Sequence, residues 1–192
     1  MGNWSKITAP LSVDVLSRYE ASDICKSLIL EDELPSQSIE KLTSKGSPFD
    51  VVQFICHGLG ARDSIFFGVK SLELRNDVWS SLETLALAAS QEWVFDPGEM
   101  IRIRAHKLST KLGLRSGPSW LAEAVFWSGP GSISEVDEEP LSPPEYLYAR
   151  AVCAAIATAA ALPPWPSGSP GKMEYYEQVV TIGKNIATGS AS

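Results

Sequence analysis

The sequence is poor in the residues from which metal and catalytic sites are most often built. Its 192 residues include two histidines, His57 and His106, and three cysteines, Cys25, Cys56 and Cys153. No two cysteines form a C-x-x-C pair, and neither histidine lies at ligand spacing from a group of acids or cysteines. We therefore expect no metal ion, no cofactor and no catalytic residue.

Motifs for phosphate binding and nucleophilic catalysis are also missing. Gly129-Pro130-Gly131 follows no predicted strand, and a run of acids comes after it instead of Gly-Lys-Ser/Thr. Cys56 and His57 are adjacent, and adjacent side chains on a helix point about 100° apart, which does not favour a nucleophile–base pair. Carboxylates that meet only in the tertiary structure remain an alternative basis for an enzyme.

Long hydrophobic runs are absent, and we expect no secretory leader. The longest apolar run covers residues 151–162, whereas a membrane-spanning helix needs about 20 residues. Residues 1–6 contain no apolar core of a signal peptide. We expect a cytoplasmic protein without membrane insertion, in which three separate cysteines beside apolar neighbours are buried free thiols.

The chain has fewer basic than acidic residues. The chain has 16 Lys and Arg against 23 Asp and Glu, a formal net charge of −7. Such a surface repels phosphate backbones and anionic membranes, so we expect no nucleic-acid partner. Hydrophobic residues make up 44% of the chain, which is enough for a substantial core.

What is present is a recurring way of starting helices. The stretches Ser47-Pro48-Phe49-Asp50, Asp96-Pro97-Gly98-Glu99 and Ser142-Pro143-Pro144-Glu145 each place a capping side chain before a proline, with an acid in the first turn. A weaker version is Ser169-Pro170-Gly171-Lys172. Proline loses no hydrogen bond in the first turn, and the acid faces the positive end of the helix dipole. Four helix starts are predicted.

Apolar spacing supplies the other elements. A period of 3.6 residues predicts helices over 21–30, 35–44, 63–74, 78–94, 97–112, 118–127, 143–162 and about 170–187, besides the one that begins at Pro48. No segment alternates as a strand does. We predict an all-α fold, a compact single-domain bundle of about 7–9 helices over residues 21–189, without significant β-sheet. Residues 1–20 show no clear pattern and are expected to be loosely ordered.

Three surface features are candidates for an interaction site. Arg102, Lys107 and Lys111 belong to a basic run on the polar face of the helix over 97–112, which is either a solvated face or a docking surface. The acidic loop contains Glu135, Asp137, Glu138 and Glu139, and it is a possible partner for that run within the chain. Trp165 lies in a Pro-rich loop, where it either anchors an interface or folds onto the core.

Several motifs together resemble a known family. They are Phe126-Trp127-Ser128-Gly129 with the acidic Pro-rich loop after it, Pro143-Pro144, Ala149-Arg150-Ala151-Val152, the block from Trp93-Val94 through Pro97 and Glu99 to Arg102, and Gly183 with Ile186-Ala187-Thr188-Gly189. In these the chain resembles an uncharacterised bacterial family of helical proteins encoded in type VI secretion gene clusters, over about residues 20–189. The shared residues are structural in character, so the resemblance implies no catalytic residue.

Three functional hypotheses follow. The first is a non-enzymatic accessory, adaptor or chaperone-like protein that binds a component or secreted effector of a type VI secretion system. The second is an immunity protein that neutralises a secreted toxin, since opposite charge speeds association with a basic toxin. The third is an enzyme with a carboxylate-based site.

Overall fold

The structure of the protein is a computed structural model, which describes residues 4–129, 131–134, 139–163, 165 and 171–190. Over these residues it is all-α, as predicted, and the only strand-like feature is an isolated bridge between Ile7 and Leu59. The described helices are α1 (Ser12–Leu16), α2 (Asp23–Leu28), α3 (Pro35–Lys45), α4 (Pro48–Gly58), α5 (Ala61–Glu73), α6 (Ser81–Phe95), α7 (Glu99–Leu112), α8 (Gly117–Phe126), α9 (Leu147–Ala161) and α10 (Gly171–Thr188).

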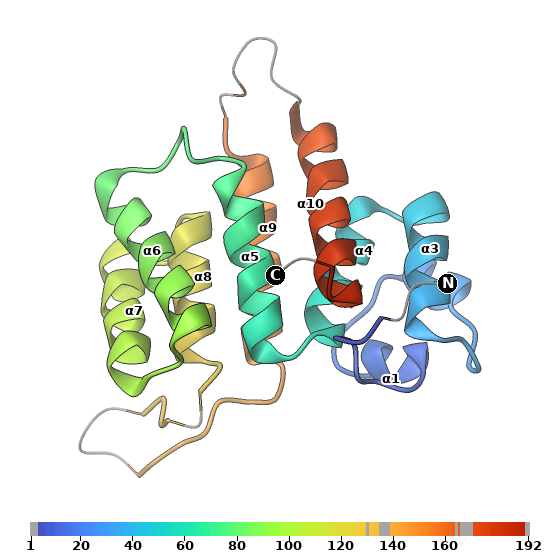
Figure 1. Ribbon diagram of the computed structural model, residues 1–192, viewed down its shortest axis with the longest axis horizontal. Helices are drawn as coiled ribbons and strands as arrows, with labels where there is room; N and C mark the ends of the chain where they lie inside the picture. The colour runs from blue at the N-terminus through green and yellow to red at the C-terminus, as the bar shows by residue number, and fades with distance from the viewer. Residues whose placement is uncertain (1–3, 130, 135–138, 164, 166–170, 191–192) are drawn as a thin grey trace.

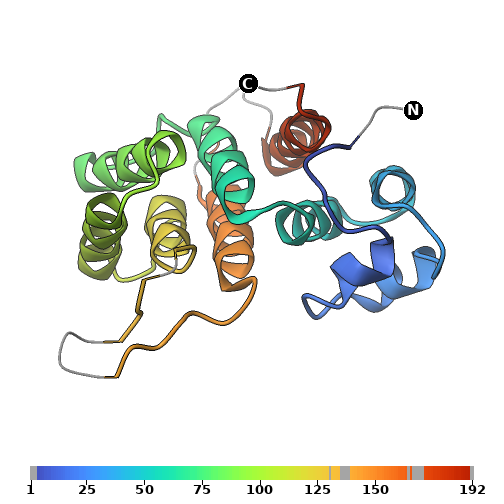
Figure 2. The same cartoon turned by 60° about the horizontal axis from the view of Figure 1, so that its bottom comes forward.

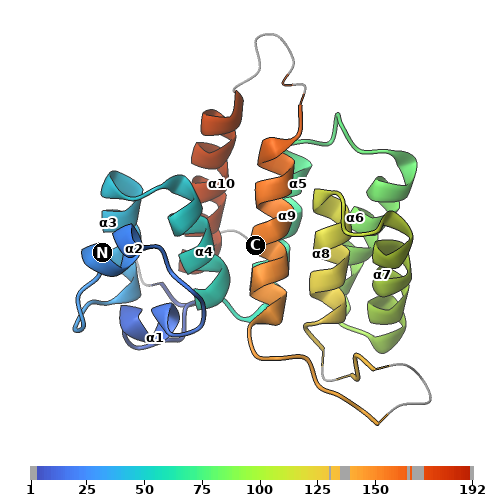
Figure 3. The ribbon, with the colours of Figure 1, turned by 180° about the vertical axis from the view of Figure 1, so that it is seen from behind.

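The longer helices form two layers. Helices α6, α5 and α10 lie side by side in one layer, and α7, α8, α9 and α4 form the other, with α1–α3 packed at the α4 end (Figures 1 and 2). Seen from behind, α9 runs between α4 and α8 (Figure 3). One continuous hydrophobic cluster includes buried side chains from Ile7 to Ala187.

The helix starts at residues 47–50 and 80–83 are reciprocal caps. The Ser47 hydroxyl accepts from the Asp50 amide at 3.2 Å, and the Asp50 carboxylate accepts from the Ser47 amide at 3.2 Å. Ser80 and Glu83 repeat this arrangement at the start of α6. Each pair satisfies two backbone N–H groups that a helix leaves open. The first start was predicted, whereas the second was placed at residue 78.

Two other predicted starts lie later than expected. Helix α7 begins at Glu99 after an N-terminal cap at Gly98, and Asp96 instead ends α6. Helix α9 begins at Leu147 rather than Pro143, after a turn in which the Leu147 amide donates to the Pro144 carbonyl. Consecutive prolines explain the second shift, because Pro144 disfavours helical dihedral angles at the residue before it. The fourth start, at 169–172, falls partly outside the described residues.

The N-terminal segment is more ordered than expected. Residues 12–16 form α1, which brings the helices of the described residues to ten, and Ile7, Val15 and Tyr19 lie in the core. The Ser12 amide donates to the Glu33 carbonyl at 2.8 Å. This segment lacks periodicity because isolated side chains, rather than one helical face, attach it to α3 and α4.

Arginines cover the C-terminal ends of four helices. Their side chains donate to the last carbonyls of α4 (Arg18 to His57, 2.7 Å), α6 (Arg62 to Val94, 2.5 Å), α8 (Arg102 to Phe126, 2.8 Å) and α9 (Arg75 to Ala159, 2.9 Å, and to Leu162, 3.1 Å). The last carbonyls of a helix lack partners inside the helix and lie at its negative end. A guanidinium supplies both the donor and the charge, so these arginines join helix ends to neighbouring elements.

Two small residues allow the central helices to approach closely. A Cβ atom at Gly68 on α5 would lie 2.5 Å from Leu121 Cδ1 on α8. One at Gly183 on α10 would lie 2.9 Å from Ile55 Cδ1 and 3.0 Å from the Phe67 ring. Helix α8 is buried nearly all round, as its apolar sequence predicted. Within the part of the chain that the structure describes, no helix is long and apolar enough to cross a membrane.

Candidate interaction surface

Arg102, a predicted interaction residue, is buried. Its side chain is 2% exposed and donates to both Glu99 carboxylate oxygens, at 2.6 and 2.7 Å, and to the Ser132 carbonyl at 3.1 Å, besides the Phe126 carbonyl at the end of α8. The expectation that the whole basic run is a polar face was therefore wrong for Arg102. Residue 102 lies one turn from buried Ala105 on the face that packs against α8.

The remaining charged candidates are on the surface or outside the described residues. Lys107 and Lys111 are exposed on α7, and Glu139 is exposed in the loop before α9. Glu135, Asp137 and Glu138 lie outside the described residues. The arginine ion pairs of α7 that the structure describes join Arg102 to Glu99 and Arg104 to Glu92, so neither uses Glu139.

Trp165 packs onto the protein. The Arg75 guanidinium lies 3.8 Å from the centre of the Trp165 ring, and the Tyr175 ring lies 5.7 Å away. Trp165 is half-buried. It covers Arg75, the buried arginine whose side chain donates to the carbonyls at the C-terminal end of α9. Trp165 was expected either to anchor an interface or to fold onto the core, and its position matches the second alternative.

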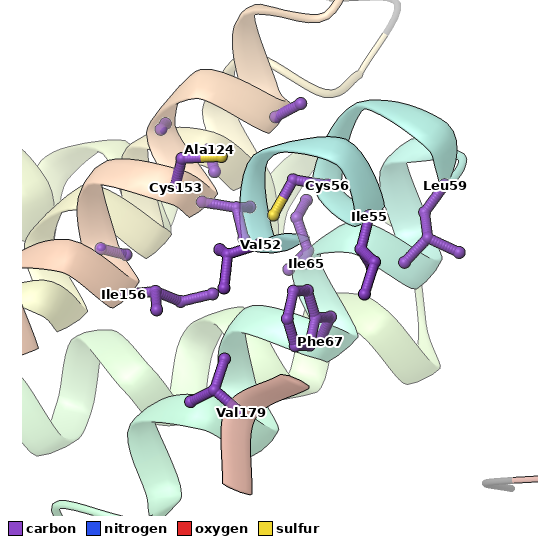
Figure 4. Packing of buried hydrophobic residues seen from close by; sticks show 14 of the residues in the cluster. Val52, Ile55, Cys56, Leu59, Ile65, Phe67, Ala124, Cys153, Ile156 and Val179 are labelled. Atoms are coloured by element: carbon purple, nitrogen blue, oxygen red, sulfur yellow. The ribbon is translucent and has the colours of Figure 1, made fainter. Parts of the chain in front are cut away.

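Cys56 and Cys153 form a thiol pair between α4 and α9, with both sulfur atoms in the gap between the helices (Figure 4). Burial and the contact with Cys153 raise the pKa of Cys56. Burial would also raise the pKa of Cys153, but the Cys56 thiol and the His57 imidazole outweigh burial and lower it. All three cysteines are free and buried, as predicted.

The two histidines lie in different surroundings. His57 is 1% exposed, stacks on Tyr19 with ring centres 4.4 Å apart, and its Nδ1 lies 2.8 Å from the Gln53 carbonyl. His106 is partly exposed, stacks on Phe126 at 3.8 Å, and its Nδ1 lies 3.1 Å from a Glu123 carboxylate oxygen. Glu123 is 17 residues away in sequence, so no local spacing indicated this pair. Among the described residues, no three His, Cys, Asp or Glu side chains are placed to hold a metal ion.

An open groove runs between α5 and α10. Its floor is formed by Phe66, Leu74, Ile182 and Ile186, and one part of it has a volume of ≈ 350 Å³. A continuation toward the start of α10 is lined by Glu174, Glu177, Gln178 and Thr181, together with Leu74 and Ile182. Helices α5 and α10 face the viewer side by side in Figure 1, with α9 behind α5. We call this feature the α5–α10 groove.

The rim of the α5–α10 groove is acidic. Lys70 is paired with Glu73, with Nζ 2.8 Å from Oε2, so these two charges offset each other. Glu174 and Glu177 are exposed and have no ion-pair partner among the described residues. The groove therefore combines an apolar floor with uncompensated negative charge.

Sequence reasoning did not identify this groove. Periodicity assigned Ile186 to the inner face of the last helix and Phe66 to the apolar stripe of the helix over 63–74. The available signal was Glu174 and Glu177, acids one turn apart beside an apolar stripe. That pattern is also typical of any solvated helix, and only the position of α5 makes it the edge of a groove.

Comparison with known proteins places the chain in a family without assigning it a role. No curated protein matches the chain significantly, and no solved structure does. A family profile matches residues 38–187, which include α4 to α9 and most of α3 and α10. The chain belongs to DUF6931, a family of unknown function.

Proposed function

We propose that this chain is a non-enzymatic protein-interaction component of a bacterial type VI secretion system, with an accessory, adaptor or chaperone-like role. The assignment to secretion rests on the motif resemblance, from Phe126-Trp127-Ser128-Gly129 to the closing Gly189. The interaction role rests on one observation, the open apolar α5–α10 groove with its acidic rim. Grooves between helices are a common site for a partner helix.

Two further exposed apolar side chains lie away from the α5–α10 groove. Met100 is 87% exposed and Phe95 is 67% exposed, and both lie where α6 meets α7. Single exposed apolar residues are ordinary on protein surfaces, so these two do not define a site.

The experiment for this proposal is capture from the native host. The chain, tagged at its own chromosomal locus, should recover a component or effector of the secretion apparatus in near-stoichiometric amount. Deletion of the gene should reduce secretion of that effector. Recovery of no such protein under secreting conditions, with unchanged secretion in the deletion strain, would contradict the proposal.

An immunity role is the second candidate, because the net charge of −7 and the acidic groove favour a basic toxin. It predicts that co-expression of this chain rescues cells from the product of a neighbouring toxin gene. It also predicts unimpaired secretion in the deletion strain, whereas the accessory role predicts impaired secretion.

A further inference from the structure

We propose that the α5–α10 groove binds a basic amphipathic helix of a partner protein, with apolar side chains on the floor and Lys or Arg side chains over Glu174 and Glu177. This inference rests on the proposed interaction function and names the surface and the chemistry of the partner.

The dimensions of the groove suit a short helix. Its lining on α10 extends from Glu174 to Ile186, which is about 18 Å at the rise of an α-helix, or just over three turns. A helix of this length presents apolar residues at positions i, i+3, i+4 and i+7 along one face. Leu74, 37% exposed, and half-buried Phe66 and Ile182 are the apolar side chains on the floor available to receive them.

The acidic rim of the groove favours a partner helix with positively charged side chains. Glu174 and Glu177 lie one turn apart on α10, so a helix in the groove passes within reach of both. Lys70 adds little positive charge because Glu73 holds its ammonium group. A second copy of this chain is a poorer occupant, since each copy has a net charge of −7 and two acidic rims repel.

The floor is fixed before a partner binds. Gly183 brings α10 against Ile55 and Phe67, and Val179 and Ile186 are 0% and 2% exposed. Helix α10 therefore cannot move away from α5 without opening the core. A preformed groove reduces the entropy lost on association.

The probe is a designed peptide of leucine and lysine, of about 16 residues because shorter isolated helices are marginal in water. A scrambled peptide of the same composition and a leucine–glutamate peptide are the controls. Binding to the full chain is measured by fluorescence anisotropy and is located by amide chemical shifts. We expect the leucine–lysine peptide to bind, with the largest shifts at Leu74 and Ile182.

Paired variants test the two parts of the groove. Glu174→Lys with Glu177→Lys should weaken binding by about tenfold or more, whereas Glu31→Lys, at an exposed acid outside the groove, should not. Leu74→Glu should abolish binding, whereas Leu85→Glu, at a side chain 57% exposed on α6, should leave it unchanged. All five positions are exposed, so circular dichroism and urea unfolding should be similar to those of the unaltered chain.

Several results overturn the inference. They are no binding, equal binding of the scrambled or leucine–glutamate peptide, no effect of the Glu174 and Glu177 reversals, or shifts in the other hollow beside α10, lined by Thr43, Pro48 and Val51. Dimerisation that covers the groove amides before peptide is added makes a second copy the occupant and also overturns it.

The same variants separate this inference from the proposed function. If the doubly reversed chain still captures the native partner, the groove assignment fails and the interaction role stands. If the peptide binds in the groove but no native partner is found and deletion leaves secretion unchanged, the secretion role fails while the groove assignment stands.

Discussion

Arg102 occupies the space into which a side chain at Gly131 would project. A Cβ atom at Gly131 would overlap the Arg102 guanidinium, and one at Gly129 would lie 2.7 Å from Arg102 Cδ. The arginine cannot move aside without losing its hydrogen bonds to Glu99, Phe126 and Ser132. The absence of a side chain at these two glycines therefore lets the chain after α8 pass close to the buried Arg102 guanidinium.

Gly131→Ser should therefore destabilise the protein by about 1–3 kcal/mol, the usual cost of forcing atoms into a packed site. Urea unfolding followed by circular dichroism measures the change. Gly60→Ser is the matched control, because a Cβ atom there meets nothing within 4 Å and serine is a good residue at the N-terminal cap of α5. Equal stability of the two variants would show that Arg102 does not fill this space.

Arg102→Leu should destabilise the protein by about 2–4 kcal/mol, because it leaves the carbonyl at the end of α8 without its charged donor. Arg104→Gln is the matched control on the same helix. Arg104 is 49% exposed and pairs with exposed Glu92, so its loss should cost less than about 1 kcal/mol. Similar costs for both substitutions would mean that Arg102 is as solvated as Arg104.

Glu99 should make stability depend on pH. Hydrogen bonds from Arg102, more than the opposing effect of burial, lower the pKa of Glu99 below its ordinary value of 4.5. A carboxyl group whose pKa is lower in the folded protein than in the unfolded chain stabilises the folded state. This stabilisation is complete at a pH above the unfolded-state pKa, and it is lost as pH falls through the folded-state pKa.

The Glu99→Gln variant should therefore differ most from the unaltered chain near neutral pH and converge with it as pH falls through the lowered pKa of Glu99. Urea unfolding across this pH range measures the difference. Glu31→Gln, at an exposed acid without an ion pair among the described residues, should show no such convergence. A difference between Glu99→Gln and the unaltered chain that grows with acidification would contradict the assignment.

The cysteines should react slowly with thiol reagents in the folded protein. The lowered pKa of Cys153 favours the reactive thiolate, but its side chain is only 4% exposed, and Cys25 and Cys56 are 0% exposed. Burial should prevail, because a reagent reaches these thiols only when the core opens.

Labelling in native buffer should be at least about a hundredfold slower than in denaturant, which corresponds to an opening free energy of about 3 kcal/mol. Pulsed alkylation with mass spectrometry measures each cysteine separately. Rapid native labelling of Cys153 alone would show that the gap between α4 and α9 admits solvent.

The sequence by itself determined the helical class, most helix positions and the burial of the cysteines. Apolar spacing and caps such as Ser47 with Asp50 act over three or four residues, so they can be read along the chain. The tertiary structure decided which charges are buried and where a groove lies. Arg102 and Arg104 look alike in sequence, yet only Arg102 meets the end of α8. The α5–α10 groove exists because two helices far apart in the chain pack side by side, and that distance in sequence leaves no local pattern.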